Sequence, residues 1–255
     1  MNWILLRGLT RERAHWGDFR ERLEEAFPRH RFHVLDLPGT GEHFHEVSPA
    51  TIAGIRRKVQ ASAEPITGPI GLLGLSMGGM VALDWAQAAP DRVRQLVLVN
   101  ASTGFSPPWQ RMKPETLGRV LALMWQRDVQ KRERAILELT SNRPVTDTLQ
   151  RRWFEIQRRR PVSLRTTLAQ LRAAARYRPG SSAPAARALL LASAGDRIVN
   201  WQCSRRLADR WSWPLLVHPD AGHDLPLDDP QWVIRQLGCE LPNRPVESPV
   251  EPSLP

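Results

Sequence analysis

The chain has 255 residues, of which 42% are hydrophobic, a composition that suits one large α/β domain with room for an inserted subdomain. Its formal net charge is +10, and its two cysteines, Cys203 and Cys239, form neither a metal-binding spacing nor a disulfide framework. No apolar run approaches the roughly 20 residues of a membrane span, and no signal-peptide pattern follows Met1. The sequence therefore predicts a cytoplasmic protein without a membrane span.

Short apolar runs of strand length alternate with helical segments along most of the chain. The predicted strands are residues 2–6, 32–37, 70–75, 95–99, 188–193 and 214–218. The predicted helices of this part are Trp16–Phe27, Pro49–Ala63, Met80–Ala88, Trp201–Trp211 and residues 230–238. Such alternation predicts an α/β fold with a mainly parallel sheet of about six strands and helices on both faces.

Residues 104–185 interrupt this alternation. They contain no strand-like run, and their predicted helices are residues 115–126, 129–141, 146–160 and 163–176. We therefore divide the chain into an α/β core (1–103 and 186–239), an inserted helical cap (104–185) and a proline-rich tail (240–255). A segment so rich in proline is expected to be extended or disordered.

The cap carries the whole excess of positive charge. It holds 17 Lys and Arg against 6 Asp and Glu, a net +11, whereas the rest of the chain nets −1. Two interpretations are open: a solvated arginine-rich face, or a docking surface toward which long-range attraction steers an acidic partner. The segment has no nucleic-acid motif and no clean amphipathic lipid-binding helix, which argues against those partners. Trp109, Trp125 and Trp153 are predicted to form the core of the cap, with a binding platform as the alternative.

The strand at 70–75 runs into Gly74-Leu75-Ser76-Met77-Gly78, a G-x-S-x-G pattern followed by a helix of small residues. In this context the pattern is typical of a nucleophile elbow, a turn so tight that the serine backbone is strained and its neighbours must be glycine. The turn would lift the Ser76 hydroxyl above the sheet, close to a helix N-terminus that favours negative charge. The alternative is a glycine-rich turn whose serine merely caps a helix.

A serine hydroxyl becomes a nucleophile when a base takes its proton and a third group orients that base. His223 follows the last predicted strand, and Asp196 follows the strand before it. Because the ends of parallel strands share one edge of a sheet, we expect Ser76, Asp196 and His223 to meet there. For Asp196 the alternative is a turn or helix cap. The backbone N–H groups of Met77 and Leu9 are the candidates for an oxyanion hole.

Several motifs together resemble those of the α/β-hydrolase superfamily over residues 2–238. They are Leu5-Leu6-Arg7-Gly8, Asp36-Leu37-Pro38-Gly39-Thr40-Gly41, Gly74-Leu75-Ser76-Met77-Gly78-Gly79, Gly195-Asp196-Arg197-Ile198-Val199 and Ala221-Gly222-His223-Asp224. The order Ser76, Asp196, His223 is also that of the superfamily. The His-Gly pair that the superfamily has after its first strand appears here as Arg7-Gly8, which bears on the entrance to the oxyanion loop.

Within the superfamily the chain is most similar to the pimeloyl-acyl-carrier-protein methyl ester esterases, through Trp109-Gln110-Arg111-Met112-Lys113-Pro114-Glu115. This resemblance implies hydrolysis of an ester or thioester through an acyl-enzyme, with no metal and no organic cofactor. It also implies a cap over the site whose basic residues dock an acidic acyl carrier protein. We take Trp109 and Arg7 as candidate substrate or cap contacts. A non-hydrolytic ligand-binding protein on the same fold is the alternative.

Overall fold

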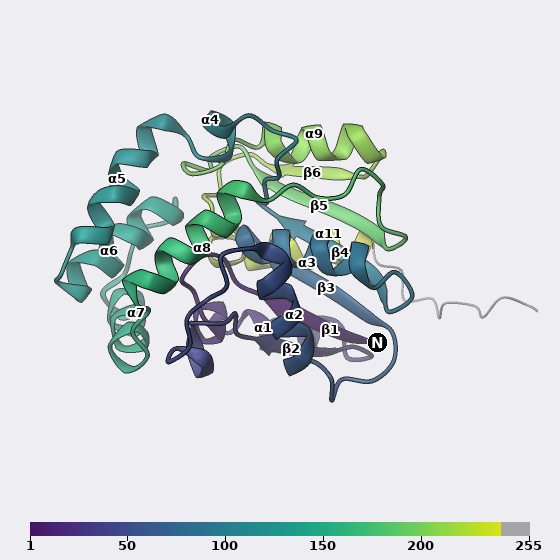
Figure 1. Ribbon diagram of the computed structural model, residues 1–255, viewed down its shortest axis with the longest axis horizontal. Coiled ribbons are helices and arrows are strands. Elements are labelled where there is room, and N and C mark those ends of the chain that lie inside the picture. Colours follow the sequence, from purple (N-terminus) through teal and green to yellow (C-terminus); the bar gives the residue numbers. More distant parts are fainter. Residues whose placement is uncertain (241–255) are drawn as a thin grey trace, which may run out of the picture.

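The computed structural model describes residues 1–240 and contains one parallel sheet of six strands in the order β2-β1-β3-β4-β5-β6 (Figure 1). The strands are β1 (Asn2–Leu6), β2 (Arg31–Leu35), β3 (Ile70–Leu75), β4 (Val93–Val99), β5 (Arg187–Ser193) and β6 (Leu215–His218). The predicted α/β class and sheet are therefore confirmed. Residues 241–255 of the predicted tail lie outside the described residues.

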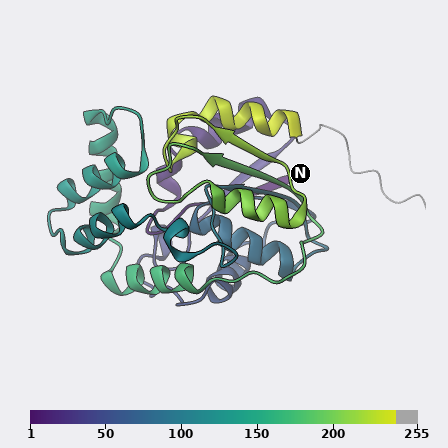
Figure 2. The ribbon, with the colours of Figure 1, turned by 90° about the horizontal axis from the view of Figure 1, so that it is seen from above.

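Two layers of helices cover the sheet, because successive side chains of each strand point to opposite faces. The helices of these layers, seen on both sides of the sheet in Figure 2, are α1 (Phe19–Ala26), α2 (Ile52–Ser62), α3 (Met77–Ala88), α9 (Gln202–Trp211) and α11 (Pro230–Glu240), with the single-turn α10 (Leu225–Asp228) before α11. Ile4 and Leu72 belong to the core on the face of α2, α3 and α9, whereas Leu5 and Leu73 belong to the core on the face of α1 and α11. This arrangement leaves the carboxyl edge of the sheet open to the loops that follow the strands.

Three helices begin three residues away from their predicted starts: α1 at Phe19, α2 at Ile52, and α3 at Met77 instead of Met80. The segment expected as one helix over Trp16–Phe27 is split at Gly17, whose φ of 65° ends the short 3₁₀ helix η1 (Arg13–Trp16) before α1 begins. A second short 3₁₀ helix, η2, spans Gly41–His43. The next helix, α2, starts at Ile52 instead of Pro49, because the Thr51 hydroxyl caps it by accepting the N–H of Gly54 at 3.1 Å.

Five helices lie between β4 and β5 and extend beyond the carboxyl edge of the sheet (Figure 1). They are α4 (Pro108–Arg111), α5 (Pro114–Trp125), α6 (Val129–Thr140), α7 (Asp147–Arg159) and α8 (Leu164–Arg176). The single-turn helices α4 and α10 were not predicted. The prediction of buried tryptophans is right for Trp153, which is 2% exposed, and wrong for Trp109 and Trp125, which are 63% and 79% exposed.

The same substitution should have opposite effects at two helix glycines. A Cβ on Gly78 would lie 2.5 Å from the carbonyl oxygen of Arg7 and also against that of Leu6, whereas one on Gly118 would have no heavy atom within 4 Å. We expect Gly78→Ala to lower the free energy of unfolding by about 2 kcal/mol or more. Gly118→Ala should raise it by about 0.5–1 kcal/mol because glycine is unfavourable inside a helix. Urea unfolding measures both, and equal stabilities would contradict the close approach of α3 to β1.

Candidate active site

Ser76 occupies the turn between β3 and α3 with φ 57° and ψ −118°, a conformation that non-glycine residues rarely adopt. The turn is held because the Ser76 N–H donates to the carbonyl oxygen of Val99 at 2.8 Å and the Ser76 carbonyl accepts the N–H of Gly79 at 2.9 Å. The serine side chain makes no capping hydrogen bond with α3. The hydroxyl is therefore presented above the sheet, and the helix-cap interpretation does not describe it.

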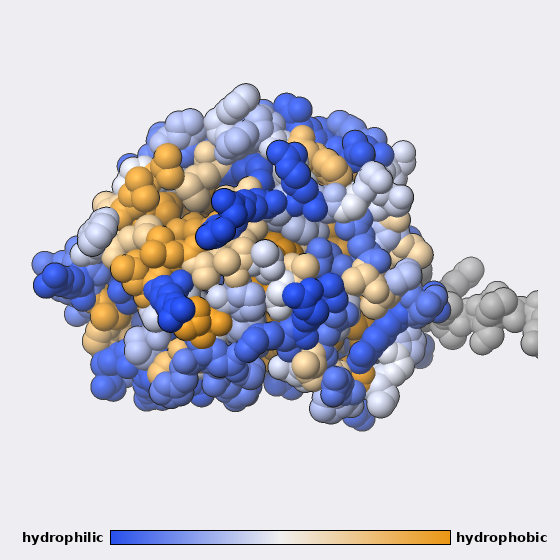
Figure 3. Space-filling view, viewed as in Figure 1, coloured by the Kyte–Doolittle hydropathy of each residue, from blue (hydrophilic) through white to orange (hydrophobic). Residues whose placement is uncertain are grey.

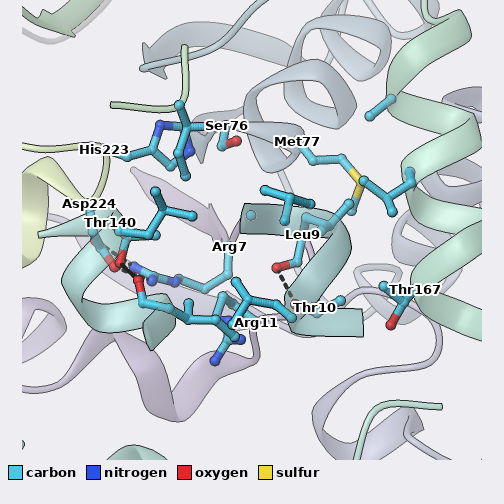
Figure 4. A pocket seen from close by; sticks show the side chains of 18 of the residues that line it. Arg7, Leu9, Thr10, Arg11, Ser76, Met77, Thr140, Thr167, His223 and Asp224 are labelled. Atoms are coloured by element: carbon cyan, nitrogen blue, oxygen red, sulfur yellow. Dashed lines mark hydrogen bonds and ion pairs between the residues drawn. The ribbon is translucent and has the colours of Figure 1, made fainter. Parts of the chain in front are cut away.

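A cavity of about 270 Å³ lies above this turn, between the strand ends and the inserted helices (Figure 4). Five residues predicted for the site line it: Arg7, Leu9, Ser76, Met77 and His223. Figure 4 shows Ser76, Leu9 and His223 around one space, whereas the side chain of Arg7 is directed toward Asp224. The strand ends thus bring together residues that are far apart in the sequence.

The Nδ1 atom of His223 lies 2.7 Å from Oδ2 of Asp196. The other carboxylate oxygen of Asp196 accepts the backbone N–H groups of Ile198 at 2.7 Å and Val199 at 3.0 Å, and the residue is 1% exposed. With Nδ1 engaged, Nε2 is the ring nitrogen available to a group in the cavity. Burial alone would lower the pKa of His223, but the charge and hydrogen bond of Asp196 outweigh it and raise that pKa above its ordinary value.

Asn100, which directly follows β4, supports the loop of His223. Its side chain donates to the His223 carbonyl at 2.8 Å and accepts the N–H of Ser193 at 2.8 Å, and its φ is 46°. It thereby ties the end of β4 to the end of β5 and to the histidine loop. In the sequence alone, this position is notable only because it is not a carboxylate. The feature that could have indicated its role is that a polar residue stands directly after a buried strand.

The Trp109–Glu115 motif contacts the loop that carries Asp196. Lys113 donates from Nζ to the carbonyl of Asp196 at 2.6 Å and from its backbone N–H to the carbonyl of Ile198 at 2.9 Å. The Thr116 hydroxyl donates to the carbonyl of Arg197 at 2.5 Å. The motif therefore joins the inserted helices to this loop, whereas Trp109 is not among the cavity-lining residues of the described chain.

Met77 and Leu9, whose backbone N–H groups are the candidates for an oxyanion hole, both line the cavity. Met77 is the first residue of α3, so its N–H has no acceptor within the helix. Leu9 follows Gly8, where an added Cβ would lie only 3.3 Å from the Ser76 Cβ. The loop after β1 therefore lies close to the serine, and a side chain at position 8 would be tightly packed against it.

Arg7 is buried at 3% exposure and does not extend into solvent. Its guanidinium binds both carboxylate oxygens of Asp224 at 3.0 and 2.5 Å, and it lies 4.8 Å from the ring centre of Trp16. Of the two predicted contact residues, Arg7 thus borders the cavity while Trp109 does not.

Over residues 1–240, no group of three or more His, Cys, Asp and Glu side chains could hold a metal ion. Within the same residues, each helix is too short or too polar to cross a bilayer.

A model of the alpha/beta hydrolase family matches residues 3–236, so the chain belongs to the α/β-hydrolase family. Its curated relatives include the pimeloyl-[acyl-carrier protein] methyl ester esterase of Vibrio campbellii, 37% identical over 117 residues. The enzyme of the same name from Pectobacterium carotovorum is 36% identical over 118 residues. Each alignment covers 45% of this chain and 43% of the relative, so the chain spans less than half the length of these relatives.

Solved structures agree with this fold over nearly the whole chain. A putative lipase from Acinetobacter baumannii aligns with a TM-score of 0.73 and 22% identity, over 94% of this chain and 83% of that one. The enol-lactonase from Burkholderia xenovorans aligns with a TM-score of 0.73 and 17% identity, over 94% of this chain and 90% of that one. At such low sequence identities, the similarity to these two structures shows the fold alone.

The Asp196–His223 contact predicts how the histidine titrates. We expect His223 to titrate above the ordinary histidine pKa and Asp196→Asn to move its midpoint to lower pH, because burial would then act without the carboxylate. NMR of labelled histidine rings measures both. His30, whose pKa burial and the N-terminal ammonium lower, is the internal control and should not move. An unchanged His223 midpoint in the variant would contradict the contact.

Proposed function

We propose that the protein is a serine hydrolase that cleaves a carboxylic ester or thioester through an acyl-enzyme. The observation that carries this proposal is the 2.7 Å contact between Asp196 and His223, because His223 lines the same cavity as Ser76 on its strained turn. A nucleophile on such a turn, a histidine and a buried carboxylate are the three groups that acyl transfer requires. Membership of the α/β-hydrolase family supports the same assignment.

In this mechanism Ser76 Oγ attacks the acyl carbonyl while His223 Nε2 takes its proton. The N–H groups of Met77 and Leu9 stabilise the oxyanion. His223 then gives the proton to the departing alcohol or thiol, and Asp196 holds the imidazole and stabilises its charged form. Water then enters and attacks the acyl carbonyl while His223 Nε2 takes one of its protons. His223 gives that proton to Ser76 Oγ as the bond between Oγ and the acyl carbon breaks, which releases the acid and restores the serine hydroxyl.

Removal of the nucleophile should abolish this activity without loss of the fold. We expect Ser76→Ala to lower kcat on p-nitrophenyl butyrate by at least about 10⁴-fold. The matched control is Ser204→Ala, since Ser204 is 2% exposed on α9 and lies outside the cavity lining. Wild-type turnover by Ser76→Ala would contradict the proposal. A folded wild-type protein that bound an ester saturably and released no acid would instead favour the ligand-binding alternative.

The lining of the cavity favours an apolar acyl chain. Its walls are formed largely by aliphatic side chains of the inserted helices: Val120, Leu123, Met124, Ile136, Leu139, Leu164 and Leu171. Met77 and Met80 add two flexible thioether side chains near Ser76. We infer that the acyl chain lies between these walls, with its carbonyl at Ser76.

We further propose that the acyl group is presented by an acidic acyl carrier protein, which is the substrate form named for the curated relatives. The outer surface of the inserted helices combines exposed apolar and basic groups. Figure 3 shows hydrophobic surface gathered over α5 and α8, broken by hydrophilic side chains. The exposed apolar residues there are Leu117, Leu121, Trp125, Leu164 and Leu168. Arg119, Arg165 and Arg172 are exposed on the same two helices and would attract an acidic partner.

Charge reversal on these helices should weaken recognition of the carrier and spare the chemistry. We expect Arg119→Glu/Arg165→Glu/Arg172→Glu to raise KM for methyl-pimeloyl carrier protein about tenfold and to leave kcat on p-nitrophenyl acetate unchanged. Higher salt should reduce the wild-type preference for the carrier-bound ester. The control is Arg57→Glu/Arg94→Glu, at exposed arginines of the α/β core. Equal effects of the two sets would contradict docking on α5 and α8.

A further inference from the structure

A second buried ion pair lies beside the proposed triad. Arg7 and Asp224 are 3% and 2% exposed, both line the cavity, and the guanidinium binds the carboxylate through two hydrogen bonds. Burying two charges costs free energy that their attraction barely offsets, so such a pair is poorly explained by stability alone. Its location suggests a role in the site.

The ion pair joins two loops whose relative position matters for the proposed reaction. Arg7 directly precedes Gly8 and Leu9, which approach Ser76, and Asp224 directly follows His223; the two residues are 217 positions apart in the sequence. Asp224 is further fixed because its N–H donates to the carbonyl of Thr140 at 2.8 Å. A displacement of either loop would therefore break the bidentate contact (Figure 4).

The charged groups around His223 come from three loops. Asp196 and Asp224 favour the protonated ring, and Arg7 opposes it. From the inserted helices, Glu133 of α6 also reaches the cavity lining, where it is paired with Arg11 at 2.5 Å. Arg7 therefore offsets a carboxylate that would otherwise act on the imidazole from the residue next to it.

We propose that Arg7 is a positioning residue which, through Asp224, holds His223 in register with the Gly8–Leu9 loop and offsets the carboxylate charge beside the base. This inference rests on the proposed hydrolase function. It also gives a physical role to the arginine that replaces the family histidine after the first strand. Arg7 acts through Asp224 and takes no proton in the reaction.

The test uses three variants and the pH dependence of kcat/KM on p-nitrophenyl butyrate. Arg7→Gln leaves the charge of Asp224 uncompensated, so His223 should hold its proton more tightly. The acid limb, which is the low-pH side of the kcat/KM profile, should therefore move to higher pH, and activity at pH 6 should fall about fivefold. Asp224→Asn leaves Arg7 uncompensated, so the limb moves to lower pH. In Arg7→Gln/Asp224→Asn the two shifts should cancel, although kcat stays below wild type because the loops are no longer joined.

Two further variants separate the effect of the Arg7 charge from the effect of its hydrogen-bond geometry. Arg7→Lys keeps the charge and loses the bidentate geometry, so it should lower kcat and leave the acid limb in place. Arg11→Gln/Glu133→Gln removes another buried ion pair of the cavity wall and should leave the acid limb in place. Thermal unfolding measures the stability of each variant, and Arg7→Lys or the double variant serves where a single variant does not fold.

Histidine NMR gives a readout that does not depend on turnover. The His223 midpoint should rise in Arg7→Gln and fall in Asp224→Asn, whether or not the chosen ester is a substrate. If the protein hydrolyses no ester while the His223 midpoint still shifts in opposite directions in the two variants, the proposed hydrolase function is overturned and the Arg7–Asp224 coupling stands. Midpoints that do not move, or that move in the same direction in both variants, would overturn the role of Arg7.

Discussion

The close approach of α3 to the end of β1 is the constraint on which the site depends. Gly78 packs against the carbonyl groups of Leu6 and Arg7, and Gly8 packs against Ser76, so no side chain separates the two elements. Ser76 enters α3 from β3 with a positive φ of 57°. This close approach sets how near Ser76 lies to the loop after β1, so the positions of Ser76 and of the Gly8–Leu9 loop are coupled.

The other loops at the carboxyl edge of the sheet are also held in position relative to one another. Asp196 follows β5 and His223 follows β6, and Asn100 at the end of β4 holds both regions through its amide group. The strands were readily predicted because strands buried on both faces of a parallel sheet are continuous apolar runs. The pairing of Asp196 with His223 could also be anticipated, since the topology alone brings their loops to one edge.

Other contacts were not predictable because the residues that make them have ordinary local patterns. Nothing near Arg7 in the sequence indicates a partner 217 positions away, and nothing in the Lys113 motif indicates that its ammonium binds the Asp196 carbonyl at 2.6 Å. Periodicity shows which residues of a helix share a face, but it does not show which face other elements cover. Trp125 was therefore placed in a core although it is 79% exposed on α5.

The formal charge of the inserted segment overstates the charge available to a partner. Arg111 donates at 2.8 and 2.5 Å to the carbonyls of Ala175 and Ala174 near the C-terminus of α8, and Arg160 pairs with Glu12 of the core at 3.1 Å. These arginines hold the insert together and attach it to the sheet domain. An acidic partner would respond to the local field of the exposed arginines on α5 and α8, and because exposed charges are screened within about 8 Å at physiological salt, their position beside the apolar surface matters more than the net +11 of the segment.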